Sequence, residues 1–257
     1  MPDVSEILKQ TGHRPWPIPQ KPWLMTQTWR QLLFAHYPIE PDFIAPFIPK
    51  GLELDTCDGQ AWVSVVPFKM GFRLRYSPFE VKFDELNVRT YVIHDKKPGV
   101  FFFSLDANDL FTVVGARLTF SLPYHLAKME LQKTPAHISF SSQRYGSPAG
   151  KHQFEAKYQP VSDVYHAEAQ TLDHWLAERY CLYSVANNGT LYRGDIHHRP
   201  WPLQQAEANF GMNTLFQDDK QLLTGEPQLF HYSEHLDIII WAPEKLEKSF
   251  KNPYRTK

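Results

Sequence analysis

The chain has 257 residues, of which 42% are hydrophobic, 14% aromatic and 21% charged, which is the composition of a globular protein with a sizeable core. Its formal net charge of −1 offers no basic surface of the kind that binds nucleic acid, so nucleic acid is not an expected partner. The two cysteines form no CxxC motif, no signal peptide is visible and no apolar run is long enough to cross a membrane, so we expect a cytoplasmic protein without a membrane partner.

The N-terminal segment is rich in proline. Residues 13–23, "HRPWPIPQKPW", carry a proline every two to four positions and cannot form a helix or a central strand. We therefore predict that this stretch is extended, within a proline-rich N-terminal arm over residues 1–25, followed by a single domain over 26–245 and a basic tail over 246–257.

Most of the chain reads as strand. Two Asp-Gly or Asn-Gly dipeptides lie between alternating runs, which is the strongest short-range signal of a hairpin. The predicted strand segments are 52–68 with its turn at Asp58-Gly59, 180–198 with its turn at Asn188-Gly189, and 85–94, 99–106, 136–142, 152–160 and 229–242.

Three short helices are predicted, at 40–49, 107–122 and 171–180, the last with Thr171 as its cap. Pro123 would end the second helix, because the residue before a proline avoids helical backbone angles. The candidates for its N-terminal cap are Asp106, Asn108 and Asp109. Because strands outnumber helices, the predicted fold class is α+β and β-rich, a barrel or a pair of curved sheets.

A row of polar residues stands out in "ELNVRTYV". Glu85, Asn87, Arg89 and Tyr91 alternate with apolar residues, so on a strand they share one face. Such a row could face solvent. The neighbouring strand at 99–106 is apolar on both faces and is predicted to be central, so we expect the row to line a cavity instead.

The sequence lacks the GxxxxGK[ST], GxGxxG, HExxH and GxSxG motifs, which argues against several large enzyme classes. Its histidines invite a metal hypothesis, since His231 and His235 have the same parity on a strand and His197 and His198 are adjacent. No spacing supplies a third ligand, so no metal and no cofactor is predicted.

Several segments together resemble the DUF2071, or YqjF-like, family over about residues 26–243. They are "ELNVRTYV", "VFFFSLDA", "ARLTFSLPYHLAKM", "ERYCLYS", "IHHRPWPLQQAEANF" and "HLDIIIW". The resemblance implies an architecture similar to acetoacetate decarboxylase, with a barrel or cone of mostly antiparallel strands, a few short helices and a central cavity.

The similarity to acetoacetate decarboxylases can be followed residue by residue. Arg117 and Pro123 match that family's arginine and the start of its Pro-Lys-Lys triplet, and Glu85 matches its cavity glutamate. Tyr124 and His125 stand where the two lysines would be. A phenol cannot form the imine that the first lysine forms, so the resemblance does not imply acetoacetate decarboxylation.

Lys128 is the lysine with the best position to replace the missing one. On an extended chain it shares a face with Tyr124, so it could reach the same cavity. Alternatively, it pairs with Glu130 or reaches solvent, as lysines usually do.

Three interpretations follow. The chain is an enzyme acting on a small carbonyl or carboxylate compound by acid–base chemistry, a non-catalytic binder of a small metabolite, or a barrel closed by an internal Glu85–Arg117 ion pair. A small molecule is the expected partner in the first two, and a homo-oligomer is left open. The residues expected to form the site are Glu85, Tyr124 and His125 for acid–base chemistry and Arg89, Tyr91, Arg117 and Lys128 for binding.

Overall fold

The computed structural model of the protein describes residues 3–216, 223 and 225–248. The helices are α1 (Val4–Lys9), α2 (Pro41–Ile44), α3 (Leu110–Thr119) and α4 (Leu172–Ala177), with a 3-10 turn η1 (Ala45–Phe47). The strands are β1 (Trp23–Ile39), β2 (Glu53–Leu54), β3 (Ala61–Leu74), β4 (Val81–His94), β5 (Lys97–Ala107), β6 (Tyr124–Lys133), β7 (Ile138–Arg144), β8 (Gln153–Pro160), β9 (Cys181–Val185), β10 (Thr190–His198), β11 (Gln204–Asn213), β12 (Leu229–Trp241) and β13 (Glu244–Lys248).

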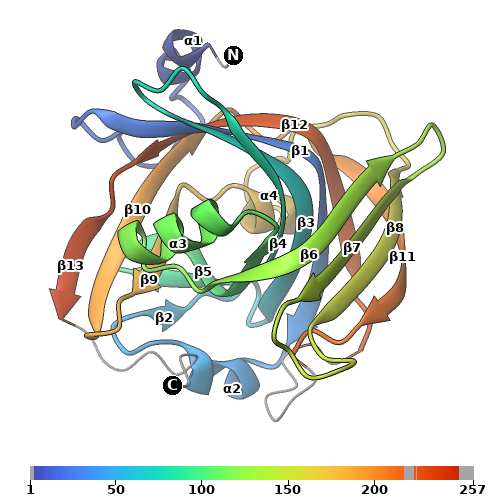
Figure 1. Ribbon diagram of the computed structural model, residues 1–257. Helices are drawn as coiled ribbons and strands as arrows, with labels where there is room; N and C mark the ends of the chain where they lie inside the picture. Colours follow the sequence, from blue (N-terminus) through green and yellow to red (C-terminus); the bar gives the residue numbers. More distant parts are fainter. Residues whose placement is uncertain (1–2, 217–222, 224, 249–257) are drawn as a thin grey trace.

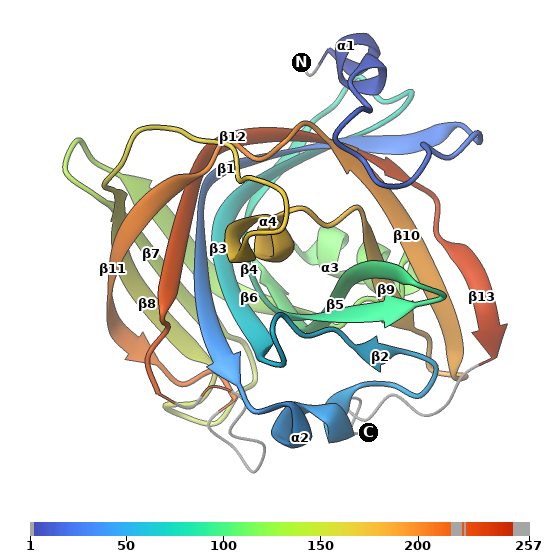
Figure 2. The ribbon, with the colours of Figure 1, turned by 180° about the vertical axis from the view of Figure 1, so that it is seen from behind.

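The strands form one sheet that closes on itself. Its order is β13-β10-β9-β5-β6-β7-β8-β11-β12-β1-β3-β4-β2, with additional pairings of β10 with β12 and of β5 with β4. These pairings make two rings that share β12, β1, β3, β4 and β5: a first ring completed by β9 and β10, and a second completed by β6, β7, β8 and β11. Figures 1 and 2 show α3 across one opening of the first ring and α4 across the other. The predicted β-rich α+β fold is confirmed.

Local sequence signals explain where the helices begin. The Asp109 side chain accepts a hydrogen bond from the main-chain N–H of Thr112 and caps α3, and Thr171 caps α4 in the same way through His174. All three predicted helices are present. The 85–94 and 99–106 strands pair as β4 and β5, and the hairpin at Asn188-Gly189 joins β9 to β10.

The predicted hairpin over residues 52–68 is only partly correct. Asp58 and Gly59 form its turn with positive φ angles of 51° and 81°, and Cys57 and Gln60 exchange both main-chain hydrogen bonds. The preceding strand β2, however, pairs with β4 and not with β3. At its N-terminal end, β3 already pairs with β1 on one edge and with β4 on the other. The pairing of β3 with β4 ends at Thr90, so the following residues of β4 can pair with β2.

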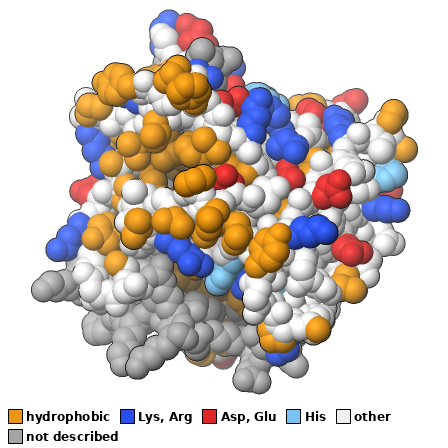
Figure 3. Space-filling view, viewed as in Figure 1, with side chains coloured by type: hydrophobic (Ala, Val, Ile, Leu, Met, Phe, Trp, Pro, Cys, Tyr) orange, Lys and Arg blue, Asp and Glu red, His pale blue; other side chains and the backbone are white. Residues whose placement is uncertain are grey.

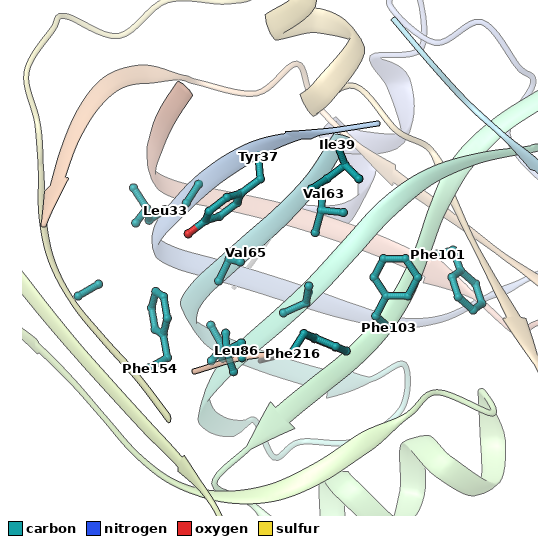
Figure 4. Packing of buried hydrophobic residues seen from close by; sticks show 14 of the residues in the cluster. Leu33, Tyr37, Ile39, Val63, Val65, Leu86, Phe101, Phe103, Phe154 and Phe216 are labelled. Atoms are coloured by element: carbon teal, nitrogen blue, oxygen red, sulfur yellow. The ribbon is translucent and has the colours of Figure 1, made fainter. Parts of the chain in front are cut away.

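The two rings have different cores. One cluster packs side chains of the shared wall against β6, β7 and β8, and Figure 4 shows part of it, including Leu33, Val65, Leu86 and Phe154. The other joins the opposite face of the shared strands to α3, α4 and β10. We call this opposite face the inner face. The shared strands are therefore buried on both sides, which is why "VFFFSL" is apolar throughout.

Both chain ends contain regular elements. In the N-terminal arm, α1 precedes the proline-rich stretch, and its Ile7 packs on Ile239 and Trp241 of β12. Residues 246–248 of the predicted tail extend β13, and the remainder of that tail lies outside the described residues. Within the described part of the chain, no helix is long and apolar enough to span a membrane.

Helix α3 turns apolar side chains outward. Only Val113 of this helix is buried, whereas Phe111 and Leu118 are 87% and 79% exposed. The space-filling view from the same side shows a broad group of hydrophobic side chains on this face of the molecule (Figure 3). The 3.6-residue periodicity thus identified the helix correctly, although most of its apolar positions face away from the core.

Candidate active site

The polar row of β4 is buried on the inner face. Glu85, Asn87, Arg89 and Tyr91 are each at most 5% exposed, while Leu86 and Val88 pack into the other core. The solvent-facing alternative is therefore wrong. A central cavity beside the row stays a prediction.

Glu85 and Tyr124 come together across the sheet. Leu105 of β5 lies opposite both Asn87 of β4 and Tyr124 of β6, and the register brings the Tyr124 side chain over β4. The Tyr124 hydroxyl donates to Glu85 Oε2 at 2.6 Å, and Asn87 Nδ2 donates to Glu85 Oε1 at 3.3 Å.

Burial dominates the acid–base properties of this pair. It raises the pKa of Glu85 to about 7; the hydrogen bonds from Tyr124 and Asn87 oppose the rise, and the nearby Asp106 adds to it. Burial and the adjacent Glu85 raise the pKa of Tyr124 well above its ordinary value, so the phenol keeps its proton. Glu85 can therefore take up or release a proton near neutral pH, as a general acid or base requires.

Arg89 is a buried cation with unused donors. Its Nε and Nη2 have no hydrogen-bond partner among the described residues, and neither does Asn87 Oδ1. The guanidinium lies 5.0 Å from the centre of the Phe34 ring, which gives a cation–π contact but fills no donor. Burial lowers the pKa of Arg89, yet an arginine stays charged at neutral pH. A buried guanidinium with two unused donors is costly, and a carboxylate would satisfy these donors in fork geometry.

His125 does not join Tyr124. Adjacent residues of a strand point to opposite faces, and Ala127 and Met129, which share the parity of His125, pack into the core of the second ring. Tyr124 packs into the inner-face core instead. The structure thus brings Glu85 and Tyr124 together and places His125 on the other side of β6.

Arg117 and Lys128 are both exposed. Arg117 Nε donates to the main-chain oxygen of Tyr124 at 2.6 Å, so it supports the β6 backbone from outside, and the proposed internal ion pair with buried Glu85 is not formed. Lys128 lines a surface hollow of about 500 Å³ over β6, β7 and β8. Of the two alternatives for Lys128, the structure has the one in which it reaches solvent.

The histidines form no metal site in the described part of the chain: no three His, Cys, Asp or Glu residues gather there as metal ligands would. His231 is buried and His235 is exposed beside Asp237. The His197 ring is 2.9 Å from the main-chain oxygen of Ile7, and His198 contacts that of Arg199.

Sequence reasoning missed a second polar group on the inner face. His36 of β1, Ser64 of β3 and His231 of β12 are fully buried and join Tyr91 to Asp173 of α4 by close contacts. The alternation of "LLFAHYPI" and "AWVSVVP" assigns His36 and Ser64 to a face, but only the pairing of β1 with β3 and β12 brings these residues together.

The comparisons with known proteins agree with this fold. The profile of the DUF2071 family, described as an uncharacterised conserved protein, matches residues 26–237. The chain is 42% identical over 232 residues to the uncharacterised protein YqjF of Bacillus subtilis, covering 89% of this chain and 95% of that protein.

Solved structures extend the likeness to two kinds of enzyme. The enduracididine biosynthesis enzyme MppR, in complex with the condensation product of pyruvate and imidazole 4-carboxaldehyde, has a TM-score of 0.64 at 12% identity and covers 93% of this chain and 94% of its own. An acetoacetate decarboxylase-like enzyme from Sphingomonas wittichii has a TM-score of 0.63 at 12% identity and covers 92% and 98%. At this identity the likeness establishes the fold alone.

Proposed function

Because the chain belongs to the DUF2071 family, whose description names no reaction, we propose from the site itself that it is an enzyme acting on a small carboxylate or carbonyl compound by acid–base chemistry. One observation carries the proposal. A glutamate with a pKa of about 7 and an arginine with unused donors are buried on the same face of β4. Ionisable residues with shifted pKa values that are buried near each other are typical of active sites. Burying a charged group without a partner reduces the stability of the fold, so such groups are commonly kept for a function.

Each residue has a distinct role in the proposed reaction. Arg89 binds the carboxylate of the substrate and fixes its orientation. The ionised Glu85 takes a proton from the carbon next to a carbonyl group, and the electron pair of that C–H bond forms the double bond of an enolate. Tyr124 holds the carboxyl group of Glu85 in place. Return of the proton from Glu85 to a different atom of the enolate completes an isomerisation, whereas return to the same carbon restores the starting compound and gives only proton exchange.

Imine chemistry is not part of this proposal. Tyr124 stands at the position expected for the lysine of acetoacetate decarboxylases, and Lys128 is exposed on the outer surface. The structural relatives support a small keto acid as the first substrate to try, since MppR is solved with pyruvate bound.

The test is hydrogen–deuterium exchange at the carbon next to the carbonyl group. Pyruvate and a panel of small keto acids are incubated with the protein in D2O, and deuterium incorporation is followed by proton NMR. We expect catalysed exchange that Glu85→Gln reduces by about 100-fold or more. Arg89→Met should mainly raise KM, because it removes a binding contact.

Glu207→Gln, a change of an exposed carboxylate on β11, is the matched control and should leave the rate unaltered. Exchange that survives Glu85→Gln would contradict the role of Glu85. A rise in melting temperature with keto acids but no exchange would favour the binding-protein alternative, which the unused donors of Arg89 also support.

A further inference from the structure

Three hydrogen bonds and one close contact connect polar residues from the inner face to the surface. Tyr91 Oη lies 2.7 Å from Ser64 Oγ, which lies 2.7 Å from His36 Nδ1. The other nitrogen of this imidazole, His36 Nε2, lies 3.1 Å from His231 Nδ1. His231 Nε2 lies 3.1 Å from Asp173 Oδ1, which is an ion-pair distance, but its N–H is not aligned for a hydrogen bond to any described residue. Four strands and α4 supply these five residues.

The chemistry of the groups gives the series one direction. An ionised Asp173 can only accept, so a small rotation of the His231 ring would turn Nε2–H toward it, and a neutral His231 then accepts at Nδ1 from His36 Nε2–H. His36 then accepts at Nδ1 from the hydroxyl of Ser64, which accepts from Tyr91. Burial, with His231 and Arg89 nearby, lowers the pKa of His36 well below its ordinary value, which agrees with a neutral ring that both donates and accepts.

The two ends lie in different surroundings. The Asp173 side chain is 32% exposed and also accepts from the Tyr165 hydroxyl at 2.8 Å. Tyr91, Ser64, His36 and His231 are at most 1% exposed. Two cations face the buried end: Arg89, and Arg179 with its guanidinium 4.9 Å from the centre of the Tyr91 ring.

We propose that Tyr91, Ser64, His36, His231 and Asp173 form a proton path between solvent and the Arg89 end of the inner face. In one shift, the Tyr91 proton passes to Ser64, the Ser64 proton to His36 Nδ1, the His36 Nε2 proton to His231 Nδ1 and the His231 Nε2 proton to Asp173. The result is a tyrosinate beside Arg89 and a neutral carboxyl group at the surface, and the reverse shift restores the start.

The path would let a ligand at Arg89 lose or gain a proton without water entering the core. That use rests on the proposed function, whereas the path itself does not. A merely structural network would hold the same residues in place but would carry no protons.

The test follows the ring proton on His36 Nε2 in the free protein labelled with 15N-histidine. Its exchange with water is compared with that of His197, which is equally buried but whose Nε2 faces the main-chain oxygen of Ile7. We expect the His36 proton to exchange about tenfold faster or more. Asp173→Asn keeps the shape and an acceptor but cannot take up a proton, and it should slow the His36 exchange about tenfold while leaving His197 unchanged.

Two further variants complete the design. Tyr165→Phe leaves the Asp173 carboxylate in place and should keep the fast exchange, and Asp163→Asn changes an exposed carboxylate nearby as the matched control. Equal rates for His36 and His197 would overturn the proposal. Faster exchange in Asp173→Asn would also overturn it, because it would indicate local opening. No ligand is needed, so a positive result would stand even if the keto-acid exchange assay fails.

Discussion

At the scale of single residues, the burial of Glu85 determines its acid–base chemistry. Glu85 is 2% exposed, its carboxyl group accepts hydrogen bonds from Tyr124 and Asn87, and no cation among the described residues forms an ion pair with it. Burial without a counter-charge favours the neutral acid, which is the cause of its raised pKa. A carboxyl group that serves only stability would more commonly be paired.

This raised pKa predicts how Glu85 affects stability. Because the folded pKa of about 7 exceeds the unfolded value of 4.5, the contribution of Glu85 is fully present below pH 4.5 and is lost as pH rises through 7. Relative to wild type, Glu85→Gln should therefore gain about 2–3 kcal/mol of unfolding free energy between pH 4.5 and 8. Urea unfolding at several pH values measures this difference. Glu207→Gln should show no such trend, and a flat difference for Glu85→Gln would mean that Glu85 titrates normally.

At the scale of elements, α3 shows how position in the ring decides burial. The helix crosses an opening of the first ring (Figure 1). It touches the core through the buried Val113 and the partly buried Ala116, while Phe111 is 87% exposed. Hydrophobic periodicity predicts that a helix forms, but it does not tell how much of its apolar surface the rest of the chain will cover.

Two substitutions in α3 should therefore differ in their effect on stability, and the smaller side chain should matter more than the larger one. Val113→Ala removes buried methyl groups and should cost about 1–2.5 kcal/mol of unfolding free energy. Phe111→Ser changes a larger side chain that is 87% exposed and should cost about 0.5 kcal/mol or less. Chemical denaturation measures both. A larger loss in Phe111→Ser would mean that this side chain is covered in solution.

At the scale of the whole molecule, buried histidines should make the protein sensitive to acid. Burial lowers the pKa of His36, His197 and His198, in the case of His197 to about 4. Their contribution to stability is complete above the unfolded value of 6.5 and is lost as pH falls, since the unfolded chain then binds more protons. On acidification to pH 4.5, His197 alone should reduce the free energy of unfolding by about 2–3 kcal/mol. This loss offsets the stability that Glu85 gains over the same range, and His36 and His198 add to the loss.

The folded state should thus be less stable at pH 4.5 than at pH 7. Thermal unfolding at the two values tests this, and His197→Asn should lose less stability on acidification than wild type does. His235→Asn, at an exposed position, is the control. If His197→Asn loses as much as wild type, His197 is not the group that responds to acid.

The sequence by itself determined most of the elements and the fold. Alternation in "ELNVRTYV" predicted the polar face of β4, turn dipeptides and caps predicted hairpins and helices, and the family resemblance predicted the barrel. These are local or family-wide properties. The catalytic roles of Glu85 and Tyr124 stay predictions. The same alternation rule would have separated His125 from Tyr124, because neighbours on a strand face opposite ways.

Only the tertiary structure decided which side chains meet. Asp173, His231, His36 and Ser64 are far apart in the chain, and their contacts depend on the pairing of β1 with β3 and β12 and on the position of α4. Likewise, β2 pairs with β4 because both edges of β3 are occupied in the closed sheet. Strand β6 pairs with β5 only over its first residues and then continues into the second ring, and Arg117 and Lys128 are exposed at the outer surface. The physical reason is the same in each case. Local pattern sets the conformation of a segment, whereas closure of the sheet sets its neighbours.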